Sequence, residues 1–204
     1  MSIRNLQFVI NSEMAVASII SAFGLAGSAG LNAYIPLFIV AVLGRMGVIT
    51  LTQPYDVITS WWAIGVLVVL GLIEFVVDKV PGADHVNDII QTFIRPTVGA
   101  LLFAANSGVI GEASPTLALI AGLVLATGVH ATKTIARPVV TTTTLGLGTP
   151  VVSFFEDLTS TVASLLAIFL PAIFLLFVVF MAYVSYRIWR RVRRAKLEEM
   201  LPNT

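Results

Sequence analysis

Long apolar stretches, separated by short polar ones, dominate this chain and predict membrane-spanning helices. They cover residues 15–43, 57–77, 97–110, 116–128, 139–155 and 158–186. A helix needs about 20 apolar residues to cross a bilayer, so the first stretch is too long for one straight crossing, whereas the third and fourth are too short. We therefore predict an all-α, polytopic transmembrane helix bundle of about six hydrophobic elements, some of them short or broken.

Glycines and prolines mark where two of these stretches depart from a straight helix. The first contains "GLAGSAGLNAYIP", in which Gly24, Gly27 and Gly30 are three residues apart. That spacing either lets another helix approach closely or marks a break in the span. Asn32 then lies near the middle of the membrane, as a binding group or as a satisfied packing residue. Pro171 predicts a kink in the last stretch.

Residues 84–96, "DHVNDIIQTFIRP", have the pattern of an amphipathic helix. Its apolar positions follow the i, i+3, i+4, i+7, i+8 spacing. The polar face carries His85, Asp88, Gln91, Thr92 and Arg95. Helices that lie on a lipid surface are rich in Lys and Arg, and this one has a single Arg. We expect its polar face to meet protein or a watery cavity, and Pro96 to end or kink the helix.

Charged residues are scarce and unevenly placed. They make up 11% of the chain, less than half of the roughly 25% of a soluble domain. Six of the twelve basic residues lie in the tail: Arg187, Arg190, Arg191, Arg193, Arg194 and Lys196. Because basic residues beside a span stay cytoplasmic, we predict a cytoplasmic segment over 1–14, a transmembrane domain over 15–186 and a cytoplasmic tail over 187–204. We expect this tail to contact anionic lipid headgroups and no nucleic acid.

The remaining charges gather between apolar stretches, which makes them candidates for a binding site. Lys133 and Arg137 are four residues apart and share a helical face, and His130 extends that face. A helix starting at Pro138 would add free N–H groups and predicts an anion site. The candidate ligand-binding residues are Asn32, Glu74, Asp78, Asp88, Arg95, His130, Lys133, Arg137, Thr141, Thr142, Thr143, Thr144, Glu156 and Asp157.

Two other interpretations of the same charges remain open. A cation site would use the carboxylates, with Glu74 and Asp78 on one helical face and Asp84, Asp88, Glu156 and Asp157 nearby. Proton coupling through a histidine is compatible with either sign of ligand. In the simpler interpretation, charges at the ends of spans mark only the water boundary. Intramembrane ionisable groups are costly and usually paired or functional, which favours a shared polar core.

Catalytic and metal-binding patterns are weak. The chain has no cysteine, and the zinc-protease, nucleophile-elbow and P-loop motifs are absent from the sequence. His85 and Asp88 are three residues apart, but two ligands make a weak metal site. We expect no cofactor and no enzymatic activity, with a membrane hydrolase as the alternative.

A short internal similarity hints at a repeat. "LAGSAGLNAYIP" begins at Leu25 and "LATGVHATKTIARP" begins at Leu125. Each opens with Leu-Ala, continues through small and polar residues, and ends in Pro. Inverted repeats of this kind frame the central site of many transporters.

Three blocks, "GLNAYIPLF", "DKVPGADHVNDIIQTFIRPTVGALLFAA" and "TKTIARPVVTTTTLGLGTP", carry a resemblance to a known family. Over roughly residues 15–165 the chain resembles the domain-of-unknown-function family four-one-two-six, which contains small integral membrane proteins of bacteria with plant relatives. The resemblance implies a multi-pass helical protein of the bacterial inner membrane. It implies no established activity and transfers no catalytic residue.

Two functions fit these observations. The first is a small transporter or channel that carries a polar solute or ion through a polar core, working as a homodimer through the glycine-rich first span. The second is a non-transporting accessory or assembly subunit of a larger membrane complex. Convergence of Lys133, Arg137, Asp88 and Glu156 on one cavity favours transport, and their dispersal along the two membrane faces favours the subunit.

Overall fold

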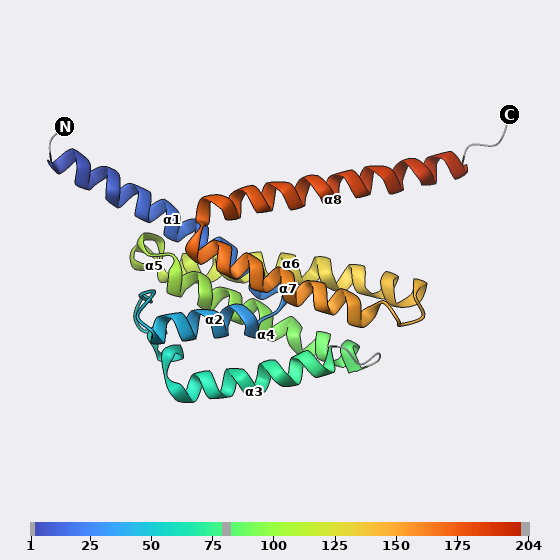
Figure 1. The fold of residues 1–204 in the computed structure, drawn as a ribbon, viewed down its shortest axis with the longest axis horizontal. Coiled ribbons are helices and arrows are strands. Elements are labelled where there is room, and N and C mark those ends of the chain that lie inside the picture. Colours follow the sequence, from blue (N-terminus) through green and yellow to red (C-terminus); the bar gives the residue numbers. More distant parts are fainter. Residues whose placement is uncertain (1–2, 79–82, 201–204) are drawn as a thin grey trace.

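The computed structural model describes residues 3–78 and 83–200, and within these ranges the only regular secondary structure is helical. The elements are α1 (Ile3–Leu31), α2 (Tyr34–Arg45), a short 3-10 helix (Tyr55–Thr59), α3 (Trp61–Val77), α4 (Ala83–Asn106), α5 (Val109–Ala113), α6 (Pro115–Thr143), α7 (Thr149–Phe169) and α8 (Pro171–Met200). Figure 1 shows most of them running along the long axis of a bundle. The predicted all-α class is confirmed.

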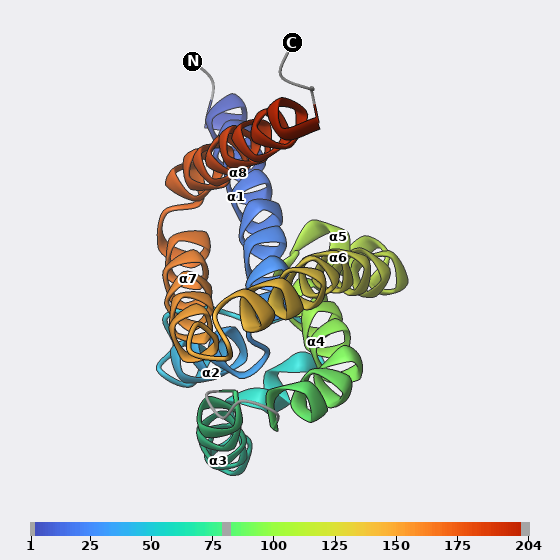
Figure 2. The ribbon, with the colours of Figure 1, turned by 90° about the vertical axis from the view of Figure 1, so that its right-hand side faces the viewer.

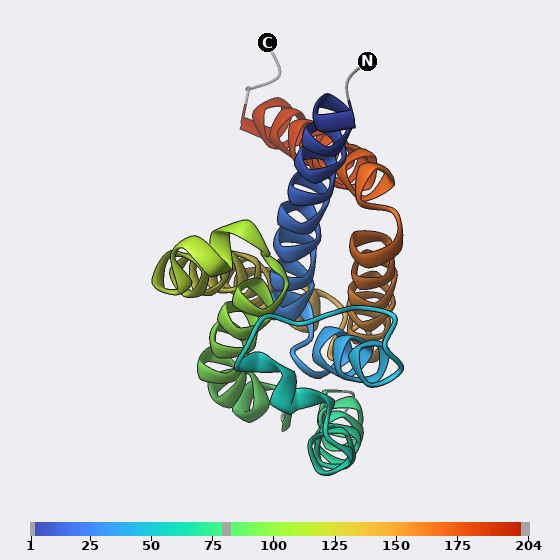
Figure 3. The same cartoon turned by 90° about the vertical axis from the view of Figure 1, so that its left-hand side faces the viewer.

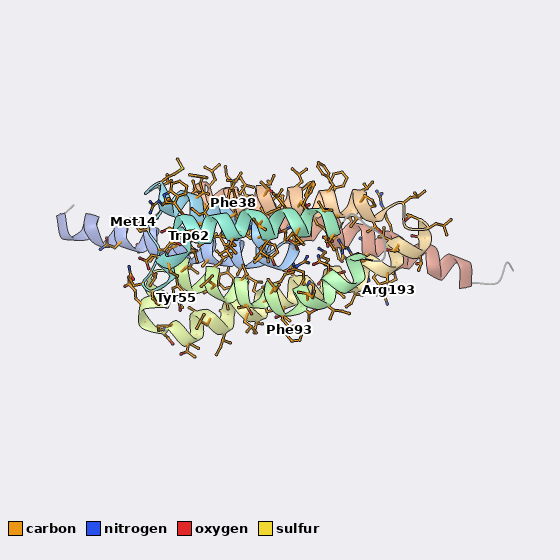
Figure 4. The ribbon with its side chains drawn as sticks, turned by 90° about the horizontal axis from the view of Figure 1, so that it is seen from below. Met14, Phe38, Tyr55, Trp62, Phe93 and Arg193 are labelled. Carbon is orange, nitrogen blue, oxygen red and sulfur yellow. The ribbon has the colours of Figure 1, made fainter. Side chains whose placement is uncertain are left out.

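Six of these helices are apolar enough to belong in a membrane. Residues 11–31 of α1, all of α6 and α7, and residues 171–191 of α8 are long enough to cross a bilayer, whereas α2 and α3 are shorter. Exposed apolar side chains such as Trp62 and Phe93 cover the outer surface, as Figure 4 shows. Such a surface requires lipid contact, so the protein is a multi-span membrane protein.

The boundaries of the helices differ from the prediction at three prolines. α6 continues through Pro138 and joins two predicted stretches, and α4 continues through Pro96 into the predicted stretch 97–110. Transmembrane helices tolerate an internal proline because neighbouring groups satisfy the freed backbone. At Pro171 the chain does not kink within one helix: α7 ends at Phe169, and Pro171 is the first residue of α8, a position where its fixed φ suits the start of a helix.

The first predicted stretch is broken at Asn32 and Ala33, between α1 and α2. The Asn32 Oδ1 atom accepts hydrogen bonds from the backbone N–H groups of Tyr34 (3.0 Å) and Ile35 (3.1 Å). These N–H groups have no partner within the helix that they begin. In Figure 1, α2 then runs back toward the end of the bundle at which α1 enters. The related segment 125–138 is continuous within α6, so this pair of segments lends the predicted inverted repeat no support.

Small residues let the central helices pack closely. Viewed along the long axis, α1 lies between α7 on one side and α4 and α6 on the other (Figures 2 and 3). A side chain at Gly30 would lie 2.6 Å from Val129 Cβ of α6, and one at Gly24 would meet Ala167 of α7. Glycine is therefore needed at both positions for contacts within the chain. The homodimer predicted from this face stays a prediction.

The last helix is packed least. Only 6% of the span in α8 is buried, and Figure 2 shows α8 at the opposite edge of the molecule from α3. Figure 1 also shows α1 beginning at one end of the long axis and α8 ending at the other. A bilayer perpendicular to that axis would separate these two helix ends, whereas the sequence placed both the 1–14 segment and the tail in the cytoplasm. The side of the membrane on which each end lies stays a prediction.

Candidate functional site

Ionisable side chains from α3, α4, α6 and α7, and from Asp78 directly after α3, meet inside the bundle. We call this group the ionic cluster; it consists of Glu74, Asp78, Asp88, Arg95, His130, Lys133, Arg137 and Glu156. All of its members except Glu156 are buried. The helical spacing explains the arrangement: residues 74 and 78, and residues 130, 133 and 137, each share one face of a helix. The structure thus brings together most of the predicted site residues.

Arg137 is the hub of the ionic cluster. Its Nη2 atom lies 2.9 Å from Asp78 Oδ2 and 3.3 Å from Glu156 Oε2, and its Nη1 atom lies 3.1 Å from Asp88 Oδ2. One guanidinium therefore binds carboxylates carried by three different parts of the chain. The five fixed donors of Arg suit such a junction. Loss of this side chain would leave several buried negative charges facing one another.

Lys133 lies one turn before Arg137 and connects the ionic cluster to the break between α1 and α2. Its Nζ atom is 2.8 Å from Glu156 Oε2, 3.5 Å from Asp78 Oδ2 and 3.2 Å from the Leu31 carbonyl oxygen. That carbonyl is at the C-terminal end of α1, where carbonyls lack helical partners. Beside it, Asn32 Nδ2 donates to Asp157 Oδ1 at 2.9 Å. The helix break is thus held by polar groups of α6 and α7.

Arg95 forms a second layer of the ionic cluster. Its Nη2 atom donates to Glu74 Oε1 at 2.9 Å, and its Nη1 atom lies 3.2 Å from His130 Nδ1. Because Arg can only donate, Nδ1 accepts, and the neutral imidazole carries its proton on Nε2. That nitrogen lies 3.1 Å from Thr92 Oγ1, which in turn donates to the Asp88 backbone carbonyl. His130 is therefore held in one tautomer.

Neutral polar side chains that the sequence did not single out complete the site. Asn87 Nδ2 donates to Asp78 Oδ1 at 2.9 Å, and Ser153 Oγ lies 3.4 Å from Asp78 Oδ2. Gln91, noted on the polar face of α4, is also buried. Asp88, Gln91 and Arg95 of this polar face are buried and so meet protein as expected, whereas Thr92 is exposed and the His85 side chain lies outside the described ones. Asn and Ser are common in loops and caps, so no signal in the sequence distinguished these two.

The ionic cluster has more carboxylates than permanent cations. Among the side chains that the structure describes, it contains four carboxylates and three permanent cations. Three buried acceptors, Glu74 Oε2, Asp88 Oδ1 and Gln91 Oε1, find no hydrogen-bond partner in the described protein, and neither do the Nε atoms of Arg95 and Arg137. Unpartnered buried polar atoms are costly. The surplus of negative charge fits a bound proton or small cation better than a bound anion.

Two cavities flank the ionic cluster. One, of about 520 Å³, lies between α1, α6, α7 and α8 and reaches Lys133 and Glu156. The other, of about 240 Å³, lies between α4 and α6 and is lined by Asp88 and Arg137. The ion pairs between these residues therefore lie between the two cavities.

The predicted helix start at Pro138, on which the anion site depended, is wrong. Pro138 lies inside α6, so no helix begins there, and Lys133 and Arg137 already bind carboxylates. The threonine run is also not part of the site, because three of its members are exposed: Thr142, Thr143 and Thr144 donate to backbone carbonyls of the preceding turn. Thr141 Oγ1 lies 3.2 Å from Thr149 Oγ1.

The other predicted sites lie apart from the ionic cluster. The side chains of Asp84 and His85 are outside the described residues, and the described side chains include no group of three or more acidic residues or histidines placed to hold a metal. In the tail, Arg187, Arg190, Arg191 and Arg193 are exposed, while the Arg194 and Lys196 side chains are outside the described ones. Arg187 lies over Tyr183 (5.6 Å) and Arg193 lies over Trp189 (5.2 Å). Aromatic residues beside basic ones are typical of a membrane interface.

Comparison with known proteins agrees with these observations. The family model described as Domain of unknown function (DUF4126) matches residues 19–191, a range that contains the ionic cluster and both cavities. No curated protein and no solved structure matches the chain significantly. Because the matched range covers most of the chain, this membrane protein belongs to the DUF4126 family.

Proposed function

We propose that this protein transports a small polar solute or ion across the membrane, with the ionic cluster as its binding site. The observation that carries the proposal is the burial of paired charges between two cavities. Ionisable side chains inside a membrane are costly, and they mark substrate and ion pathways. A purely structural role is a poorer explanation, since replacing a buried ion pair by apolar residues is often neutral or stabilising.

The charge balance of the ionic cluster favours a cation or a proton as the transported species. The ionic cluster has a surplus of carboxylates, and the unpartnered Glu74 Oε2 and Asp88 Oδ1 atoms are acceptors. A proton or a small cation would satisfy such atoms, whereas an anion would add to the surplus. We therefore assign the carboxylates to cation or proton binding and the three basic side chains to holding them in place.

The break between α1 and α2 supports the same function. In transporters, discontinuous helices place free backbone groups at the binding site. Here the free carbonyl of Leu31 binds Lys133, and Asn32 binds Asp157 next to the ionic cluster. Asn32 thus serves both the helix break and the site.

The alternative, a non-transporting subunit, is favoured by one observation. α8 is almost unburied, although it is apolar over a full span, so another membrane protein has room to pack against it. Affinity purification that returns one partner in fixed stoichiometry, combined with no flux, would support this function.

Flux measurements in proteoliposomes test the proposal. We expect the reconstituted protein to carry at least one cation or proton current, and Asp88→Asn to lower it about tenfold or more, because the substitution removes a charge without changing shape. Glu112→Gln is the matched control, since Glu112 is an exposed acid outside the site. Flux equal to that of protein-free liposomes for a panel of protons, metal cations, anions and small polar solutes would contradict transport.

A further inference from the structure

The larger cavity, next to the ionic cluster, has mixed chemistry. α8 contributes apolar side chains that include Phe174, Phe177 and Met181, and α6 and α7 contribute Val129 and Ala163. Lys133 and Glu156 line the same cavity. Its volume of about 520 Å³ lies within the range of about 300–1,000 Å³ that holds a drug-sized ligand. Apolar walls around a small charged region fit an amphiphilic molecule.

The exposed fractions determine which charge such a molecule meets. The Lys133 side chain is 2% exposed, whereas the Glu156 side chain is 14% exposed. Lys133 is also bound by two carboxylates and the Leu31 carbonyl. Glu156 Oε2 is itself bound by Lys133 and Arg137, but the most exposed charged group of these ion pairs is this carboxylate. The surplus of carboxylates in the ionic cluster adds to the negative potential there.

We propose that this cavity binds a hydrophobic organic cation, of the quaternary ammonium or phosphonium class. The cationic centre lies beside Glu156, where the low dielectric strengthens its attraction to the carboxylate. The apolar groups pack against α8, and the rings of Phe174 and Phe177 offer additional cation–π contact. As a substrate class this assignment rests on the proposed transport function, but the binding itself does not.

Two probes of the same shape and opposite charge provide the test. The purified full-length protein in lipid nanodiscs is titrated with tetraphenylphosphonium and, separately, with tetraphenylborate, and binding is measured by equilibrium dialysis. We expect saturable binding of the phosphonium, with a Kd at least about tenfold lower than that of the borate. Glu156→Gln is expected to weaken phosphonium binding by about tenfold or more and to leave borate binding no weaker.

A steric pair of variants tests the cavity without changing any charge. Gly27 lines the cavity, and a Cβ atom added at Gly27 meets nothing within 4 Å, so the side chain of Gly27→Leu starts in open space. Gly65 of α3 has the same open surroundings and lies on the exposed surface, so Gly65→Leu is the matched control. We expect phosphonium binding to be lost in the first variant and unchanged in the second.

The outcomes separate this inference from the transport proposal. Equal binding of the two probes, or phosphonium binding that survives Gly27→Leu, overturns the inference. Phosphonium binding without flux of any solute supports the cavity and contradicts transport. Inorganic ion flux without phosphonium binding supports transport and overturns the assignment of the ligand.

Discussion

α6 and α8 are both long apolar helices with basic residues, but they use these residues in opposite ways. On α6, Lys133 and Arg137 point into the bundle and bind carboxylates. On α8, Arg187 and Arg193 are exposed near the end of the helix and lie over aromatic rings. The position of the charges along the helix decides the difference. α6 carries its charges within the span, where an unpaired charge would have a large desolvation cost. α8 carries its charges near the helix end, where water or lipid headgroups reach them.

The comparison teaches that basic residues of the same type have different roles in one membrane protein. A charge in the middle of a span must be matched by partners from other helices, and it therefore ties those helices together. A charge beyond the span ties the helix to the membrane surface instead. Mutations at the two kinds of position are expected to act on different properties.

The largest effect on the folded state is expected at Arg137. Replacement by Met leaves the carboxylates of Asp78, Asp88 and Glu156 without their shared partner, and breaking a buried pair costs about 3–5 kcal/mol. Thermal unfolding in detergent, followed by tryptophan fluorescence, measures the loss. Arg187→Met makes the same chemical change at an exposed position, and its unfolding midpoint is expected to equal that of the wild type. Equal midpoints for Arg137→Met and Arg187→Met would contradict the contrast between α6 and α8.

A smaller effect is expected when both partners of one buried pair are removed. Glu74 and Arg95 bind each other at 2.9 Å with almost no exposure. Because each single substitution leaves one buried charge unpaired, we expect Glu74→Gln with Arg95→Met to be less destabilising than the sum of the two singles, with a coupling of about 1–3 kcal/mol. Urea unfolding of the four proteins in the cycle measures the coupling. Strict additivity would show that the two side chains do not depend on each other.

The smallest effect on folding is expected in the tail. Replacing Arg187, Arg190, Arg191 and Arg193 by Ser removes exposed charges, so the unfolding midpoint should not change. The affinity for anionic lipids should fall about fivefold for each arginine removed. The protein should therefore retain fewer anionic lipids. Native mass spectrometry with phosphatidylglycerol measures retention, and phosphatidylcholine serves as the control lipid. Unchanged retention would mean that lipid headgroups do not bind the tail.

Much of the fold was predictable from sequence because the membrane imposes a simple rule. Apolar stretches of sufficient length indicated helices, and the combination of glycines with Asn32 indicated a possible break, which lies at that position. Pro138 misled the prediction, and Pro96 does not end α4. Both are strong helix breakers in water, but in a membrane the loss of all backbone hydrogen bonds in a segment is worse than one missing donor.

The site was predictable only in part. The three- and four-residue spacings within α3 and α6 identified side chains on common faces, and these side chains do meet. The ion pairs between helices could not be predicted from the sequence. Nothing in the sequence indicates that Arg95 binds Glu74 rather than Asp88. The argument for an anion site lost its basis because no helix starts at Pro138, which lies inside α6.

The contact between Lys133 and the Leu31 carbonyl has a mechanical consequence. The Lys133 ammonium group binds both the carboxylates of the ionic cluster and the backbone at the break between α1 and α2. A competing positive charge at Glu156 would weaken the ion pair between Glu156 and Lys133. The same ammonium group would then hold the Leu31 carbonyl differently. A change at one carboxylate is thereby linked, through Lys133, to the junction between α1 and α2.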